Sequence, residues 1–240
     1  MTVYRLGRAL AFPAPSEAEP SGLLAAGGDL APERLLLAYS LGIFPWYDEP
    51  PILWFSPDPR GVLPLRPSRL HVAQRLARTL RQGLFRITLD SAFDEVLMRC
   101  TTVKRAGQRG TWITRELAAT YRELHARGFA HSCEAWHGAR LVGGVFGIAI
   151  GTAFFADSMF HLARDASKAA LTALVWHLEE HDFALVDCQL PTPHLGRLGF
   201  EAWPRERYLR ALAETVPTPR SLEKWDIDSE LVTRRAAEIR

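Results

Sequence analysis

The sequence predicts a mixed α/β protein, with a small N-terminal domain followed by a larger domain built on a mixed sheet. The larger domain is predicted from residues 141–189, where two apolar runs flank Gly151 and a helical repeat and a short apolar run follow. This order indicates a β-hairpin, an amphipathic helix and a buried strand. Proline marks the division, because 11 of the 16 prolines precede Arg69. We expect domains at residues 1–67 and 68–216 and a polar tail at residues 217–240, which is either a docked helix or a frayed end.

The composition is that of a globular chain with a full core. The 240 residues are 48% hydrophobic and 23% charged, with a formal net charge of +2. A nucleic-acid surface therefore has to come from local clustering of basic residues. Three widely spaced cysteines argue against a disulfide framework and for a reducing compartment. No apolar run approaches the roughly 18 residues of a membrane span, and the start shows no secretory pattern. We expect a cytoplasmic monomer with no membrane contact.

The N-terminal domain is expected to be rich in turns, with one helix. The helix is predicted to begin near Pro32 and to end at Gly42, since glycine tolerates the left-handed backbone that closes a helix. Aromatic residues then cluster within a dozen positions, either as the core of this domain or as a surface that docks on the second domain or on a ligand. They are Phe44, Trp46, Tyr47, Trp54 and Phe55.

A helix with a basic face is predicted next. Ser68 can cap its N-terminus, and the apolar periodicity runs to about Gly83. Between Arg69 and Arg109, nine Lys and Arg residues are opposed by three acids. This excess indicates either a solvated helix face or a phosphate-binding surface. The basic residues opposite or flanking the apolar face are Arg75, Arg78 and Arg81.

Four further elements are predicted before the central stretch. A strand at Phe85–Leu89 and a short helix at Phe93–Cys100 come first. A helix beginning at Trp112 and a strand at His131–Trp136 follow. These elements supply the remaining layers of the larger domain.

The central stretch is predicted in most detail. Leu141–Ile150 and Thr152–Phe160 read as paired strands. Asp165 is a candidate N-cap for a helix that begins near Ala166, and Ala184–Cys188 reads as a buried strand. The apolar helix face consists of Leu171, Leu174, Val175 and Leu178.

Three polar residues at the edges of this stretch predict one active site. They are Asp157, Asp187 and Gln189. Strand alternation places Asp187 and Gln189 on one face and Cys188 on the other. A carboxylate and a carboxamide at a strand end are costly if they are merely buried, although hydrogen bonding to a neighbouring loop remains an alternative role.

Two other chemistries match local patterns. The residues from His177 to His181 read H-x-x-E-H, which is typical of a class of zinc peptidases, but no third ligand is evident. Cys188 and His194 suggest a thiol nucleophile, but no local arrangement that would activate a thiol is visible. We therefore expect no metal at the site and no role for the thiol.

The order of hairpin, helix and strand resembles that of GNAT-type N-acyltransferases, which use acetyl-coenzyme A. Their loop into the helix reads R/Q-x-x-G-x-G/A, and its amides bind the pyrophosphate. Residues 164–169 read RDASKA instead. Ser167 replaces the middle glycine and Asp165 would repel phosphate, so we expect the architecture without coenzyme A.

A set of motifs in order identifies a closer resemblance. The motifs are GLLAAGGDL (22–30), LLLAYSLGIFPWY (35–47), WFSPDPR (54–60), GTWIT (110–114), AHSCEAW (130–136), LVGGVFG (141–147), DSMF (157–160), ASKAAL (166–171) and VDCQ (186–189). Over about residues 11–215 the chain resembles the leucyl/phenylalanyl-tRNA–protein transferase family. Members transfer Leu or Phe, and some Met, from aminoacyl-tRNA to an N-terminal Arg or Lys of a protein, which marks that protein for degradation.

The resemblance implies a GNAT-like second domain, no metal or nucleotide cofactor, and specific roles for individual residues. Asp187 and Gln189 match catalytic positions, and Asp157 matches a position that is usually Glu in the family. A cationic acceptor side chain needs a carboxylate partner, for which Asp157 is the candidate and Asp187 the competitor. The positions that contact the terminal adenosine are Trp46 and Trp112, with Tyr121 beside them. The positions around the aminoacyl side chain are Val145, Phe154, Leu171, Leu174 and Leu178.

The implied reaction does not require a strong base. The aminoacyl ester is already activated, and an α-amino group has a reference pKa of about 7.7–8.0, so a useful fraction is neutral near pH 7. We expect Asp187 and Gln189 chiefly to hold and align the amine and the ester, with transient proton acceptance by Asp187 as a further hypothesis. The tRNA body is expected on the Arg75, Arg78 and Arg81 side. A zinc peptidase and a nonenzymatic tRNA-binding protein remain the alternatives.

Overall fold

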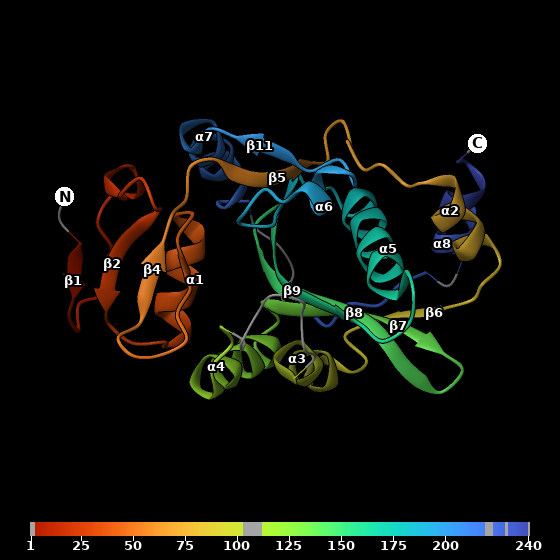
Figure 1. The fold of residues 1–240 in the computed structure, drawn as a ribbon, viewed down its shortest axis with the longest axis horizontal. Helices are drawn as coiled ribbons and strands as arrows, with labels where there is room; N and C mark the ends of the chain where they lie inside the picture. The colour runs from red at the N-terminus through yellow and green to blue at the C-terminus, as the bar shows by residue number, and fades with distance from the viewer. Residues whose placement is uncertain (1–2, 103–111, 219–222, 229, 240) are drawn as a thin grey trace.

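The computed structural model describes residues 3–102, 112–218, 223–228 and 230–239. An N-terminal unit with its own sheet lies beside a larger unit (Figure 1). The small sheet has four strands in the order β1-β2-β4-β3. The elements of this unit are β1 (Tyr4–Leu6), a 3₁₀ turn (Pro15–Glu17), β2 (Leu23–Gly27), α1 (Pro32–Ser40), β3 (Phe44–Pro45) and β4 (Leu53–Phe55).

The larger unit is built on a seven-stranded mixed sheet in the order β11-β5-β10-β9-β8-β7-β6. Strand β10 runs parallel to β9 and antiparallel to β5. The mixed α/β fold class is thereby confirmed. Although β5 precedes the expected division at residue 67, it belongs to this larger sheet. The strands are β5 (Arg60–Pro64), β6 (Arg86–Leu89), β7 (Ala130–His137), β8 (Arg140–Ile150), β9 (Ala153–His161), β10 (Leu185–Asp187) and β11 (Glu201–Trp203).

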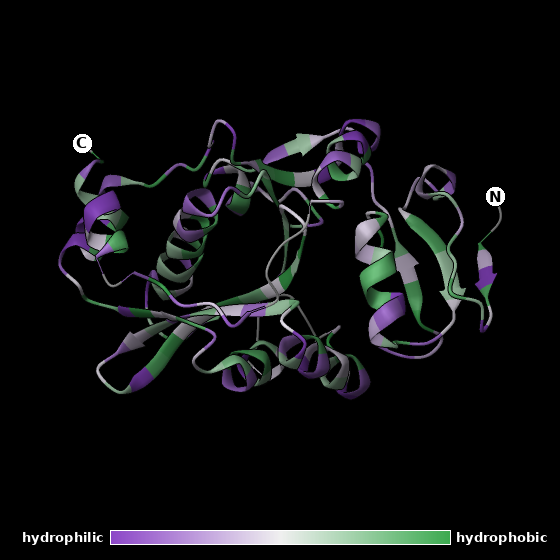
Figure 2. Cartoon of the chain, turned by 180° about the vertical axis from the view of Figure 1, so that it is seen from behind, coloured by the Kyte–Doolittle hydropathy of each residue, from purple (hydrophilic) through white to green (hydrophobic). Residues whose placement is uncertain are grey.

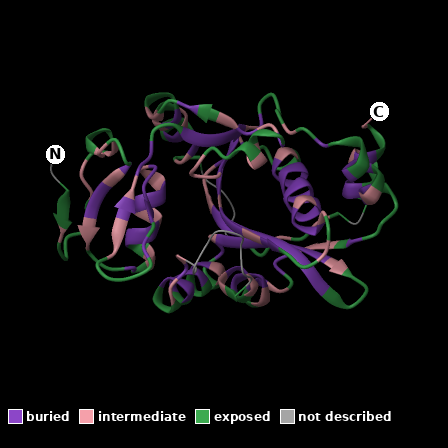
Figure 3. Ribbon diagram, in the orientation of Figure 1, coloured by how far each residue is buried: buried purple, intermediate pink, exposed green. Residues whose placement is uncertain are grey.

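Helices cover both faces of the larger sheet. Helix α5 packs on β6–β9 from one side, and α3 and α4 pack on the other side (Figure 1). Figure 3 shows that α5 and the central strands are buried along most of their length. The helices of this unit are α2 (Gln74–Arg81), α3 (Phe93–Thr102), α4 (Arg115–Ala126), α5 (Ala166–Glu180), α6 (Pro193–Gly196), α7 (Arg205–Thr215) and α8 (Leu231–Ala237).

Helix α1 packs against the larger unit through α4, and its Tyr39 ring lies 5.1 Å from the Phe155 ring of β9. As predicted, it begins at Pro32, and the chain leaves it through Gly42 with φ +74°. A Cβ at Gly42 would lie 2.8 Å from the Tyr208 ring, so α7 requires glycine there. The aromatic cluster is mostly core, since Phe44, Tyr47 and Trp54 are buried, whereas Trp46 is exposed.

The predicted hairpin, helix and strand are confirmed, and Asp165 occupies the predicted N-cap position, but without a capping bond from its side chain. Gly151 turns β8 into β9 with φ +57°, and α5 begins at Ala166. Asp165 has φ +64°, and its side chain makes no capping hydrogen bond. Its carboxylate instead accepts from Lys168 Nζ at 3.1 Å.

The predicted helix from Ser68 begins later, at Gln74. Residues 68–73 are extended, because the edge of the larger unit supplies their hydrogen bonds. The amide of Arg69 donates to Pro64 O at 3.1 Å, and that of His71 donates to Leu198 O at 3.0 Å. Ser68 is not a cap, since its hydroxyl donates to Glu179 at 2.5 Å.

The C-terminal tail packs on the larger unit in the part that the structure describes. Helix α8 lies against α2 and α5. Trp225 stacks on His131, with ring centroids 3.6 Å apart and planes at 4°, and its amide donates to Asp90 at 2.8 Å. The tail thus supplies part of the hydrophobic core rather than a free polar extension.

Figure 2 shows hydrophobic residues concentrated on the strands, while the outer turns of the surface helices are hydrophilic. Among the described residues, none of the helices combines the length and the apolar character needed to span a membrane.

Candidate active site

A cavity of about 1080 Å³ opens where β9, the end of β10 and the start of α5 meet. Asp157 and Gln189 line it, together with the basic residues Arg164, Lys168 and His194. Its remaining wall is largely apolar, so polar and hydrophobic groups line one site. The apolar lining includes Val145, Ala156, Met159, Leu171, Leu195 and Phe200.

A β-bulge directs Asp157 into this cavity. On β8, Phe146 pairs with Ser158 and Gly147 pairs with Ala156, so Asp157 is the extra residue on β9. Gly147 allows this close approach, because a Cβ there would lie 2.0 Å from Phe155 O. Bulges of this kind redirect side chains and are common beside active sites.

The carboxyl group of Asp157 is buried and only partly satisfied. Tyr39 Oη donates to its Oδ1 at 2.5 Å, and the Tyr39 and Tyr121 hydroxyls are 3.0 Å apart. Its Oδ2 is buried without a hydrogen-bond partner among the described residues. Burial raises the pKa of Asp157 to about 8, the Tyr39 hydrogen bond opposes this rise, and the nearby charge of Asp187 adds to it. A cation at Oδ2 would stabilise the ionised form.

Asp187 is fully buried in a saturated cluster. Arg60 binds it through two bonds, Nε to Oδ1 at 2.8 Å and Nη2 to Oδ2 at 2.6 Å. Tyr208 Oη donates to Oδ2 at 2.8 Å, and the amide of Gln189 donates to Oδ1 at 2.8 Å. Asp187 is not among the residues that line the cavity. The structure therefore brings Asp157 and Gln189 together in the cavity, with Asp187 behind them.

Gln189 lies just beyond the end of β10 in a left-handed conformation, with φ +60°. We assign its carboxamide with the nitrogen toward two carbonyls, Ala156 O at 3.2 Å and Cys188 O at 3.1 Å, because the opposite orientation would place the side-chain oxygen against acceptors only. The side-chain oxygen is then free to accept a hydrogen bond from a donor in the cavity. The expected alternation is wrong at this point, because the strand ends at Asp187 and both Cys188 and Gln189 line the cavity.

The thiol of Cys188 is nevertheless a poor nucleophile. Burial raises its pKa well above the ordinary value, the charge of Asp187 adds to the shift, and Arg60 opposes it. A protonated thiol lacks the reactivity of a thiolate. His194 lines the same cavity, and its pKa is lowered by burial and by the charges of Lys168 and Arg197, so it is a weak partner for activating the thiol.

The H-x-x-E-H segment does not form a recognisable zinc site. The rings of His177 and His181 are 4.1 Å apart, and His177 also packs 5.2 Å from the Trp225 ring. Across the described residues there is no group of three or more His, Cys, Asp or Glu side chains placed to hold a metal ion. The zinc peptidase alternative has no support in this region.

The five expected aminoacyl-pocket residues all lie in the core between α5 and the sheet. Val145 and Leu171 also line the cavity. Phe154, Leu174 and Leu178 are fully buried behind it, where they support the wall rather than form it.

The expected adenosine-contact residues lie apart from the cavity lining. Trp46 is 44% exposed and packs edge-on against Phe55, with ring centroids 5.4 Å apart. Trp112 is half-buried against the core. Tyr121 is fully buried and holds Tyr39, so its visible role is to support Asp157.

The expected tRNA-binding arginines are all exposed, but only part of this surface reaches the site. Arg75 lies 3.9 Å from Asp165 and lines a small cavity that shares Arg164 and Lys168 with the active-site cavity. Arg81 instead donates to Ile239 O at 3.1 Å, at the C-terminal end of α8. Lys104, Arg105 and Arg109 lie outside the described residues.

Several site residues were missed by sequence reasoning. Tyr39 and Arg60 lie inside the motifs LLLAYSLGIFPWY and WFSPDPR, and those motifs were the available signal. No motif pointed to Tyr208, which lies in α7 outside the quoted motifs. Apart from Arg75, the basic rim was also not predicted. Arg164 and Lys168 line both the active-site cavity and the small cavity beside it, and Arg75 and Arg197 line the small cavity only.

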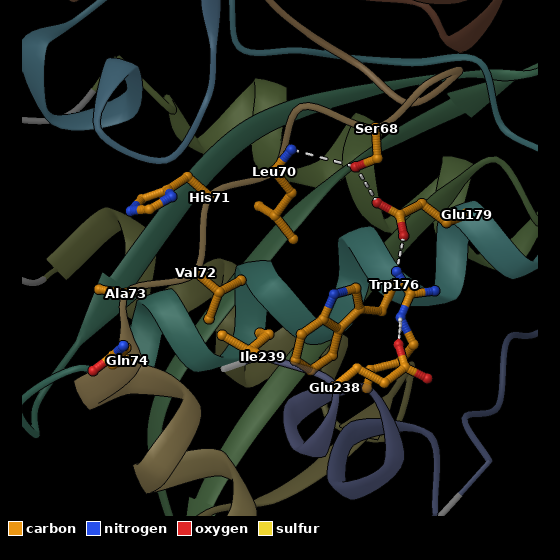
Figure 4. A pocket seen from close by; sticks show the side chains of 11 residues that line it. Ser68, Leu70, His71, Val72, Ala73, Gln74, Trp176, Glu179, Glu238 and Ile239 are labelled. Carbon is orange, nitrogen blue, oxygen red and sulfur yellow. Dashed lines mark hydrogen bonds and ion pairs between the residues drawn. The ribbon is translucent and has the colours of Figure 1, made fainter.

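A third cavity, of about 650 Å³, lies between residues 68–74, α5 and α8 (Figure 4). Glu179 accepts from Ser68 on one side of this cavity and pairs with Arg235 on the other. Trp176 and Ile239 face each other below this pair. None of the expected site residues lines this cavity, so we associate it with docking of the tail.

Comparison with known proteins agrees with the order of the motifs. The family model described as "Leucyl/phenylalanyl-tRNA protein transferase" matches residues 64–213, and the model of that family's N-terminal domain matches residues 28–58. The chain belongs to this family. The family's members are aminoacyltransferases. The first matched region lies in the N-terminal unit, and the second lies in the larger unit.

Curated relatives named leucyl/phenylalanyl-tRNA–protein transferase match nearly the full chain. The protein from Anaeromyxobacter sp. (strain Fw109-5) is 52% identical over 230 residues, which covers 95% of this chain and 97% of that protein. The protein from Desulfatibacillum aliphaticivorans is 50% identical over 96% of this chain and 98% of its own length. The protein from Thermodesulfovibrio yellowstonii is 46% identical over 98% of this chain and 96% of its own length.

Proposed function

We propose that this chain transfers Leu or Phe from aminoacyl-tRNA to the α-amino group of an N-terminal Arg or Lys of a protein, and so marks that protein for degradation. The observation that carries the proposal is one cavity lined by Asp157, Gln189, apolar side chains and the basic residues Arg164 and Lys168. The Oδ2 of Asp157 is buried there without a hydrogen-bond partner among the described residues. These four parts match an acceptor cation, a reacting amine, an apolar aminoacyl group and tRNA phosphates. The proposed compartment is the cytoplasm, where free cysteines stay reduced.

The acceptor is held by two groups in this proposal. Its cationic side chain pairs with Asp157 Oδ2 through a charge-assisted hydrogen bond. Its α-amine donates to the Gln189 side-chain oxygen, which aligns the nitrogen lone pair with the ester carbonyl. The nitrogen attacks that carbonyl carbon, an amide bond forms, and the ribose hydroxyl of the terminal adenosine leaves with a proton. Alignment supplies most of the acceleration, because the ester is already activated.

The aminoacyl side chain lies against the apolar wall that Val145 and Leu171 help to form. Hydrophobic pockets distinguish one methylene by only about 1–3 kcal/mol. Acceptance of both Leu and Phe, with some Met, is therefore expected. A charged aminoacyl group would lose its hydration without gaining a partner there.

One assay tests the proposed function. Leu-tRNA or Phe-tRNA is incubated with the protein and a peptide that begins with Arg, and the peptide mass is measured. A gain equal to one Leu or Phe residue supports the proposal. Binding of the tRNA with an intact aminoacyl ester would instead favour a nonenzymatic tRNA-binding protein, and chelator-sensitive cleavage of the peptide would favour a peptidase.

Binding of aminoacyl-tRNA should depend on the basic rim. Lys168→Ala and Arg197→Ala are each expected to raise the dissociation constant for aminoacyl-tRNA on the order of tenfold at low salt. Each should also make the negative slope of log K against log salt concentration shallower by about 0.7, the value for one phosphate contact on a single strand. Filter binding across a salt series measures both quantities.

A matched control keeps this result specific. Arg140 is an exposed arginine at the start of β8 and lines none of the three cavities described above. Arg140→Ala should leave both the affinity and the salt slope near the wild-type values. Equal losses in all three variants would show a diffuse charge effect and contradict the assignment of the rim.

A further inference from the structure

Arg60 is a fully buried arginine, and each of its three guanidinium nitrogens donates a hydrogen bond. It begins β5, and its side chain has no exposed surface. Nε and Nη2 grip the two oxygens of Asp187, while Nη1 donates to Gly42 O at 3.0 Å. Arg60 therefore connects β5, β10 and the end of α1 at one point. A lysine could not reproduce this planar fork.

Two aromatic rings fix the plane of this guanidinium. Its central carbon lies 4.9 Å from the Phe44 ring centre and 4.8 Å from the Tyr208 ring centre. Tyr208 also donates its hydroxyl to Asp187. The arginine and the carboxylate are thus held from both sides by rigid groups, and neither has room to swing into the cavity.

The carboxylate of Asp187 has no acceptor site left for a substrate. Two carboxylate oxygens offer about four lone-pair positions, and each oxygen of Asp187 already accepts two hydrogen bonds. Proton acceptance during the reaction would require one of these bonds to break beside a permanent positive charge. The geometry argues that Asp187 does not act as the base.

The bond that matters for the reaction is the one to Gln189. Gln189 adopts φ +60°, which costs a non-glycine residue on the order of 1 kcal/mol or more. Its amide donates to Asp187, and its carbonyl accepts from Gly61 N at 3.1 Å, the residue that follows Arg60. A Cβ at Gly61 would lie 2.6 Å from Cys188 Sγ, so the turn packs closely on this strand.

We propose that Arg60 is a positioning residue for the transfer reaction: it locks Asp187, and through Asp187 it fixes the left-handed turn that presents the Gln189 carboxamide to the reacting amine. This inference rests on the proposed function. Arg60 and Asp187 then act as one unit, and Tyr208 completes it. The link to Gly42 O anchors Arg60 to the turn after α1.

The experiment compares kcat and KM in full-length variants. Arg60→Lys keeps the charge and loses the fork. It is expected to lower kcat about 100-fold, the cost typical of a misplacement near 1 Å, while KM for Phe-tRNA changes by less than about threefold, since no tRNA contact is removed. Arg34→Lys is the matched control, because Arg34 is also buried and bonded to an aspartate, Asp29, but lies in the N-terminal unit. Its kcat should stay near the wild-type value.

A double variant separates positioning from simple stability. A purely structural pair can be replaced by neutral groups without harm, so Arg60→Met with Asp187→Asn should fold and remain active under that view. Under the proposal it folds, as judged by circular dichroism and melting, and keeps the low kcat. Normal kcat in Arg60→Lys, or recovered kcat in the double variant, would overturn the inference. Absence of transfer by the wild-type protein would instead reject the proposed function itself.

Discussion

The preference for an acceptor that begins with Arg over one that begins with citrulline is expected to rise about tenfold per pH unit between pH 6 and 7 and to level off above pH 8. Citrulline has the shape of arginine without its charge. Burial raises the pKa of Asp157 to about 8, so the carboxyl is mostly neutral at pH 6 and ionised above pH 8. Only the ionised form pairs strongly with the cation, and the ionised fraction grows about tenfold per unit below the pKa.

The two peptides share one α-amino group, whose own titration near pH 7.7–8.0 raises both rates equally. The ratio of their kcat/KM values therefore reports Asp157 alone. In Asp157→Asn the ratio should be flat with pH and should fall roughly 100-fold below the wild-type plateau, because an arginine that loses its buried partner loses about 3 kcal/mol or more. A pH-dependent ratio that survives in this variant would assign the acceptor cation to another group.

The position of Asp157 also illustrates what the sequence leaves open. Its apolar alternating surroundings predict β9, and the structure confirms this strand. The direction of the side chain, however, depends on a bulge opposite Gly147, where the extra residue breaks the alternation. Whether one strand bulges is decided by the tertiary pairing of two segments, and so no local pattern predicts it.

The same reason explains the error at Cys188. Period-two reasoning holds only while the backbone stays extended, and β10 ends at Asp187. The left-handed turn at Gln189 depends on a hydrogen bond to Asp187 and on packing against Gly61. These partners include a strand more than a hundred positions earlier in the chain. Element type was therefore predictable from local periodicity, whereas the cavity depended on contacts that are distant in sequence.

Replacement of Gln189 by Leu is expected to lower turnover roughly 100- to 1000-fold, the loss typical of removing one aligned hydrogen-bonding group from an active site. Leucine keeps the size of the side chain and removes both polar atoms. The amine then loses its acceptor, while the apolar wall and the basic rim keep their contacts with the aminoacyl-tRNA. Single-turnover measurement with preformed Phe-tRNA complex separates this loss of chemistry from a loss of binding.

Cys188→Ala supplies the comparison, because Cys188 is the adjacent residue and lines the same cavity. A buried thiol with a raised pKa contributes little nucleophile, so this variant should retain most of its turnover and form amide without a thioester intermediate. If Cys188→Ala were the inactive variant and Gln189→Leu the active one, the reaction would pass through the thiol and the proposed direct attack by the amine would be wrong. Equal losses in both would instead mean that the turn as a whole, rather than the carboxamide, is what the reaction requires.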